Sequence, residues 1–262
     1  MIRLRVLGGF ALDAPSGASV PRLAQRRAEA ILALLAVAGS LGCTRDRVVA
    51  LLWGESDTGH ARHSLRDALH AIRLALGHDA VVSRGDTLRI DAGSLTSDVD
   101  EFATALAASR LSDAVAVYRG PLLDGFHIPE APEFERWVDD ERDRLFGDCL
   151  GAIKRLAKMA ERDGRWDEAA EWWGRAVALD RYNSRYVARR LVALARGGDR
   201  VNALKEGEAH CRLLRSALEL EPEAAFLEEM ERIRSGGWPA RYFTPQAAPA
   251  PPETAPPKPE KP

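Results

Sequence analysis

The chain opens with apolar residues at positions 2, 4 and 6 that alternate with Arg3 and Arg5. A period of two is typical of a half-buried strand. Gly8 and Gly9 then turn the chain toward a short second strand near residues 10–12. We therefore expect a small antiparallel sheet at the front of the protein.

The hydrophobic pattern changes to a helical period over residues 23–37. Thr44 is a favourable N-cap for a second helix at residues 45–53. A third helix is expected at residues 60–76, after the stretch from Gly54 to Gly59. The sequence thus predicts three helices behind the opening sheet.

The predicted third helix has two faces of different chemistry. Its core-facing stripe recurs every three or four residues: Ala61, Leu65, Leu69, Ile72 and Leu76. Another face carries basic residues at similar spacing: Arg62, Arg66, His70 and Arg73. We therefore expect this helix to bury one side and to present a basic ridge on the other.

Two strands are predicted next, Val81–Val82 and Thr87–Ile90, joined by a tight turn with Arg84 at its tip. Strands, three helices and a terminal hairpin follow one another in this order in a winged helix-turn-helix. The fold expected for residues 1–95 is therefore a winged helix of mixed α and β structure.

In such a fold an exposed helix enters the major groove of DNA, where base edges present distinct donors and acceptors. Arg62 and Arg66 could make bidentate contacts to guanine, and Asp67 could accept a hydrogen bond from a cytosine amine. His63 and His70 could reach a base edge or a phosphate. Arginines on an outer helix face are commonly only solvated, but the full order of elements favours DNA binding.

Further arginines lie near the starts of the first two helices, where backbone N–H groups also favour anions. We predict that four of them clamp DNA phosphates and set the register: Arg26, Arg27, Arg45 and Arg47. Arg84 suits a wing that touches the DNA backbone or minor groove.

Charge supports this reading only mildly. Residues 1–95 hold 12 arginines and no lysine against nine acidic residues, a net charge of +3, whereas the remainder holds 25 basic against 30 acidic residues, a net charge of −5. The net charge alone therefore does not indicate DNA binding; that inference depends on the positions of the arginines.

These segments resemble the Streptomyces antibiotic regulatory protein type of transcriptional activator, in which an OmpR-like winged helix precedes a bacterial transcriptional activator domain. The likeness covers most of residues 1–102 and rests on these stretches: Leu7–Phe10, Gln25–Arg27, Arg45–Trp53, Ala61–Leu69 with Ile72–Arg73, Gly85–Asp91 and Asp98–Phe102. The resemblance implies binding to promoter direct repeats and recruitment of RNA polymerase.

Residues 96–236 have an almost entirely helical pattern. The stretches Gly164–Ala169 and Gly198–Ala203 are offset by 34 residues, the tetratricopeptide period. Because one helical hairpin cannot bury both faces, such repeats stack and leave a surface for a partner. We expect an all-α repeat domain that serves protein association, most simply a homodimer or higher oligomer.

The resemblance extends to this second domain, through Tyr118, Gly120–Leu122, Trp137, Arg144–Leu145 and the helix pairs that begin at Gly164 and Gly198. Two departures stand out. Gly207 occupies a helix position where the family usually has a larger residue, and the usual Asp-Pro after the first repeat is Asp180-Arg181. They affect the detail of the last repeat.

Nine of the 15 prolines fall between Pro239 and Pro262, so residues 237–262 are predicted to be a disordered tail, or a linker to a further domain. The chain lacks a membrane-length apolar run and a secretion signal at its start, so we expect a cytoplasmic protein.

No constellation points to an enzyme, a cofactor or a metal. His60 and His63 have helical spacing but lack a supporting cysteine, and His210-Cys211 has no orienting third group. The tryptophans at 166, 172 and 173 are better explained by packing than by a ligand box, and the three cysteines by buried thiols. The remaining alternative is a repeat-based protein adaptor with a vestigial winged helix.

Overall fold

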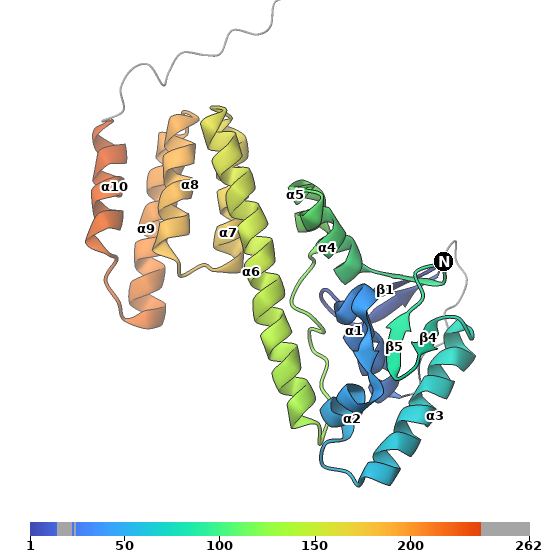
Figure 1. Cartoon of the computed structure of the whole chain (residues 1–262). Helices are drawn as coiled ribbons and strands as arrows, with labels where there is room; N and C mark the ends of the chain where they lie inside the picture. Colours follow the sequence, from blue (N-terminus) through green and yellow to red (C-terminus); the bar gives the residue numbers. More distant parts are fainter. Residues whose placement is uncertain (15–22, 24, 237–262) are drawn as a thin grey trace, which may run out of the picture. The chain divides into compact units, whose positions relative to one another are not determined.

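The computed structural model describes residues 1–14, 23 and 25–236, which divide into two compact units, one formed by Met1–Ala160 and the other beginning at Glu161 (Figure 1). The predicted Pro-rich tail, residues 237–262, lies outside the described residues. The fold is mainly helical, with two small sheets in the first unit. None of the described helices is long and apolar enough to cross a membrane.

The first sheet has the strand order β2-β1-β6. β1(Ile2–Arg5) and β2(Ala11–Asp13) are antiparallel, which confirms the opening pair expected from the alternating pattern. β6(Leu95–Ser97) adds a parallel neighbour to β1 that the sequence did not predict. The predicted boundary between residues 95 and 96 falls inside this strand. The assignment of DNA binding to the part before it and of protein association to the part after it stays a prediction.

Three helices follow: α1(Arg26–Ala38), α2(Arg45–Trp53) and α3(Thr58–Leu76), with a short 3-10 turn η2(Gly39–Leu41) after the first. The predicted start of α1 at residue 23 is wrong by three residues, because Gln25 is still in extended backbone with φ −118° and ψ 120°. The predicted N-cap is confirmed, since the Thr44 hydroxyl accepts a hydrogen bond from the Arg47 N–H. α3 starts two residues early, capped by Asp57.

The second sheet, ordered β3-β5-β4, forms the wing. β4(Val81–Arg84) and β5(Thr87–Ile90) are the predicted hairpin, and β3(Cys43–Thr44), directly before α2, pairs with β5. Helices α1, α2 and α3 pack on one another over a core that includes Ile31, Leu32, Leu35, Leu52, Leu65, Leu69 and Ile72. Leu76, expected in this core, is only half-buried because α3 ends there.

The rest of the first unit is built onto the winged helix. It contains α4(Asp98–Ala107), α5(Leu111–Val117) and the front of α6(Pro132–Arg162). The segment between α5 and α6 runs back along the first sheet, where the Leu123 N–H donates to the Val6 carbonyl at 2.8 Å and the Asp124 N–H to the Gly8 carbonyl at 2.7 Å. Arg142 of α6 donates to the carbonyls of Leu122 and Leu123.

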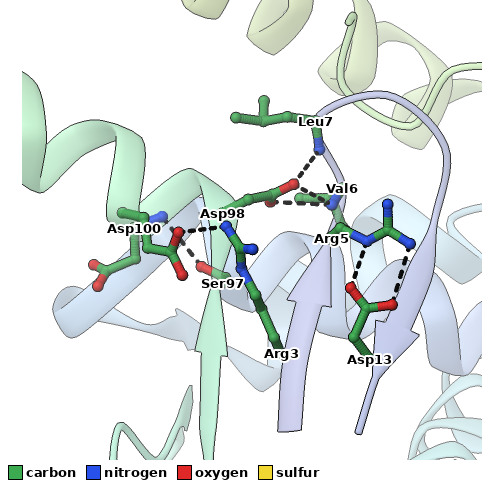
Figure 2. Close-up of polar contacts among 9 residues, drawn as sticks. Arg3, Arg5, Val6, Leu7, Asp13, Ser97, Asp98 and Asp100 are labelled. Carbon is green, nitrogen blue, oxygen red and sulfur yellow. Dashed lines mark hydrogen bonds and ion pairs between the residues drawn. The ribbon is translucent and has the colours of Figure 1, made fainter. Parts of the chain in front are cut away.

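Asp98, the first residue of α4, is buried against the end of β1 (Figure 2). Its carboxylate accepts hydrogen bonds of 3.0 Å from the backbone N–H groups of Val6 and Leu7. Burial raises the pKa of this carboxyl above its usual range, and the backbone hydrogen bonds from Leu7 and Val6 oppose the shift. The backbone N–H groups that follow β1 therefore find their acceptor in a side chain more than 90 residues away in sequence.

The second unit contains four helices among its described residues, α7(Trp166–Leu179), α8(Ser184–Arg196), α9(Arg200–Leu218) and α10(Ala224–Ser235). Each packs on the next, and α10 also reaches α8 (Figure 1). One core joins the last three helices, with Val187 and Leu191 from α8, Ala203 and Cys211 from α9, and Phe226, Met230 and Ile233 from α10. This is the consecutive stacking that the 34-residue period predicted.

Candidate nucleic-acid interface

The outward surface of α3 gathers most of the residues that the sequence singled out. Five of them are exposed: Arg62, His63, Arg66, Asp67 and His70. Arg73 belongs to the same helix but is half-buried. Leu74 is 80% exposed on this surface, and the basic pattern of the sequence did not indicate it.

Two contacts with carboxylates organise this surface. Arg62 Nη2 lies 3.5 Å from Asp46 Oδ1 of α2, and His63 Nε2 lies 3.2 Å from Asp67 Oδ2 one turn further along α3. Pairs as exposed as these contribute at most about 1 kcal/mol. Because the pairs are weak, a stronger acceptor such as a phosphate or a base edge can replace them at little cost.

A pocket of about 370 Å³ lies between the start of α2, α3 and the turn of the wing. Three arginines line it, Arg45, Arg62 and Arg66, together with Asp46 and Asp86. The structure thus brings Arg45 of α2 close to two arginines of α3 that are at least 17 residues away in sequence. Their convergence makes the pocket suitable for an anionic group.

Arg45 also ties α2 to the wing. Its backbone N–H donates to the Asp86 carbonyl at 2.9 Å, and its guanidinium donates to the Ser83 hydroxyl at 3.1 Å. Arg47 is exposed on the first turn of α2, and Arg84 is exposed where β4 ends. The start of α2 and the wing therefore form one connected framework beside α3.

Arg26 and Arg27, at the start of α1, are engaged within the protein. Arg27 Nε donates to the Leu52 carbonyl at 3.2 Å, and its guanidinium lies 5.6 Å from the Trp53 ring centroid. Arg26 donates to the His127 carbonyl at 3.0 Å. These contacts compete with the predicted role of both arginines as phosphate ligands.

Residues 88–234, more than half of the chain, match the family described as bacterial transcriptional activator domain. The chain belongs to this family. It is a transcription regulator of the Streptomyces antibiotic regulatory protein kind.

The fold is similar to that of a solved structure described as Mycobacterium tuberculosis EmbR in complex with a low affinity phosphopeptide, with a TM-score of 0.62 and 20% sequence identity. The match covers 90% of this chain and 65% of that one, so this regulator spans less than two thirds of the length of its structural relative. A comparison with curated proteins found no match.

The structure explains why this family member has glycine at position 207. A Cβ built there would clash with Met230 Sδ and would lie 2.9 Å from Leu191 Cδ1. A side chain at position 207 would therefore require Met230 of α10, which fills the space, to move.

The tryptophans of the second unit have different surroundings. Trp173 is buried, as packing predicted, and donates to Glu161 Oε1 at 2.8 Å. Trp166 and Trp172 are half-buried, and the guanidinium groups of Arg196 and Arg175 lie 4.7 Å and 4.6 Å from their ring centroids. These contacts fill the ring faces with protein side chains.

The remaining candidates are held in structural contacts. His210 is buried, with Nε2 2.9 Å from the Ser184 hydroxyl and its ring against Phe226. The three cysteines are buried, and none of them is in a disulfide. Among the described residues no group of three or more His, Cys, Asp or Glu side chains could hold a metal ion.

Proposed function

We propose that this regulator binds promoter DNA sequence-specifically, as a dimer or higher oligomer on direct repeats, and activates transcription by contacting RNA polymerase. The observation that carries the DNA-binding part is the convergence of Arg45, Arg62 and Arg66 beside the exposed face of α3. Family membership supports the activating role, and cytoplasmic location follows from a promoter as target.

The proposed contacts divide into two classes. Arg62, Arg66 and the exposed polar residues of α3 read base edges in the major groove. Arg45, Arg47 and Arg84 contact phosphates on either side, from the start of α2 and from the wing. The stacked helices of the second unit serve protein association, because such repeats expose a continuous surface to a partner.

The test is a gel shift with the full chain and DNA from upstream of its own gene and of neighbouring operons, at physiological salt with nonspecific competitor. Replacing Arg62 and Arg66 together by alanine should abolish the specific shift. The matched control is the double variant Arg119→Ala and Arg155→Ala, which removes the same charge from exposed positions outside the winged helix. The control should bind like the wild type.

Unchanged affinity of the Arg62 and Arg66 variant would reject α3 as the reading helix. A folded wild-type protein that shifts no fragment would favour the adaptor alternative. Salt offers a second readout. Three phosphate contacts in each of two protomers predict a fall in affinity of about a thousandfold between about 50 and 200 mM salt, whereas apolar contacts to a protein would barely respond.

A further inference from the structure

The outer face of α3 has a centre and a flank. His63, Asp67, His70 and Leu74 follow one another at intervals of four, three and four residues and are all exposed, so they form a single line along the helix. We call them the central stripe. Arg62 and Arg66 lie on its flank, toward α2 and the wing, because both line the pocket shared with Arg45 and Asp86.

Leu74 is the apolar member of this central stripe. The other leucines and the isoleucine in the body of α3, Leu65, Leu69 and Ile72, are at most 2% exposed, whereas Leu74 is 80% exposed. A single exposed leucine needs no explanation on an ordinary surface. This one continues the surface proposed to face DNA, where the thymine C5-methyl is the apolar group that a base pair presents in the major groove.

The dimensions agree with a reading position. Leu74 lies seven positions after Asp67, about 10 Å of helix at 1.5 Å per residue. That length corresponds to about three base-pair steps of about 3.4 Å each, and the major groove is about 12 Å wide. Asp67, His70 and Leu74 can therefore address neighbouring base pairs in one groove.

We propose that Leu74 is a specificity-determining residue that packs on the C5-methyl group of a thymine, about three base pairs from the position addressed by Asp67. This inference rests on the proposed function and adds to it the chemistry of one base. The thymine is recognised by shape and by exclusion of water from two apolar groups, with no hydrogen bond involved.

The experiment selects binding sites from a random double-stranded DNA pool with the full wild-type chain and with Leu74→Ala. The matched control is Leu41→Ala, which makes the same substitution at a leucine that is 87% exposed in the same unit but lies in η2, outside α3. Both leucines are exposed, so both variants should fold. The selected site is then synthesised with deoxyuridine in place of each thymine in turn, which removes only the methyl group.

The wild type and Leu41→Ala should select a site with a thymine at one position where Leu74→Ala accepts any base. Deoxyuridine at that position should weaken wild-type binding about fourfold, the effect of one buried methyl group, and should leave Leu74→Ala binding unchanged. This combination ties the methyl group to the leucine side chain.

Three results would overturn the proposal, and they differ in meaning. If Leu74→Ala selects the wild-type site with equal affinity, Leu74 reads no base although DNA recognition stands. If it weakens binding to every sequence equally, Leu74 acts between protein copies. If the folded wild type selects no sequence, the proposed function fails together with the inference.

Discussion

The two units of this regulator differ in the interactions that stabilise each of them internally. In the first, segments far apart in sequence meet through hydrogen bonds to backbone groups: the Asp98 carboxylate accepts from the N–H groups of Val6 and Leu7, and the Leu123 N–H donates to the Val6 carbonyl. In the second, each helix packs on the next along the chain, through side chains such as Leu191 and Met230.

This difference predicts how each unit responds to substitution. A buried N–H group that loses its acceptor costs most of its desolvation penalty, because no rearrangement supplies a new partner. A tight apolar contact can relax, because a flexible side chain such as methionine adopts another rotamer. The polar junction of the first unit should therefore be more sensitive to a single change than the helix packing of the second.

The largest effect is expected for Asp98→Ala. It leaves the N–H groups of Val6 and Leu7 buried without their acceptor, and we expect the free energy of unfolding of the first unit to fall by about 2–4 kcal/mol. Urea unfolding followed by circular dichroism measures this. Asp140→Ala, at an exposed aspartate of the same unit, should stay within about 0.5 kcal/mol of the wild type; equal losses for both variants would show that the junction is not special.

A smaller effect, with opposite signs at two sites, is expected for glycine to alanine changes in helices. At Gly207 the new Cβ would meet Met230 and Leu191, and overpacking should outweigh the gain in helix propensity, for a net loss of about 1 kcal/mol. At Gly147 in α6 nothing lies within 4 Å of the new Cβ, and Gly147→Ala should stabilise by about 0.5–1 kcal/mol.

Thermal unfolding of the two glycine variants gives the sign of each change directly. A double-mutant cycle with Met230→Ala then tests the cause, because the loss at Gly207 should shrink once the methionine is gone. A Gly207→Ala variant that is as stabilised as Gly147→Ala would mean that the close approach of α9 and α10 is easily widened.

The smallest effect is a pH dependence within the second unit. Burial lowers the pKa of His210 below its ordinary value of 6.5, so the folded chain binds fewer protons than the unfolded chain in the window just below pH 6.5. The contribution to stability is complete above pH 6.5 and is lost as the pH falls through that window toward the lowered pKa. The slope of the unfolding free energy against pH corresponds to a difference of less than one bound proton.

His210→Gln should flatten this slope, since glutamine does not titrate and can still hydrogen-bond the Ser184 hydroxyl. The measurement is the midpoint of urea unfolding between pH 5 and 7.5, at intervals of about half a unit. His70→Gln, at an exposed histidine of α3, serves as the control. If both variants keep the wild-type slope, another group is responsible for it.

The sequence by itself determined the elements whose cause is local. The spacing of Leu65, Leu69 and Ile72 predicted α3 and its buried side, Thr44 predicted the start of α2, and the 34-residue offset predicted stacked helices. Helical periods, caps and repeats depend on residues a few positions apart or on neighbouring segments, so the chain displays them directly.

Only the tertiary structure decided which distant segments meet. The residues of β6 have no alternating pattern long enough to predict a strand. They form one because they pair with the edge of β1. In the same way the contacts of Arg26 and Arg27 with the carbonyls of His127 and Leu52 could not be read from the sequence, where both arginines were predicted as phosphate ligands. Their partners lie 101 and 25 residues away, and a local pattern contains no information about a contact over such separations.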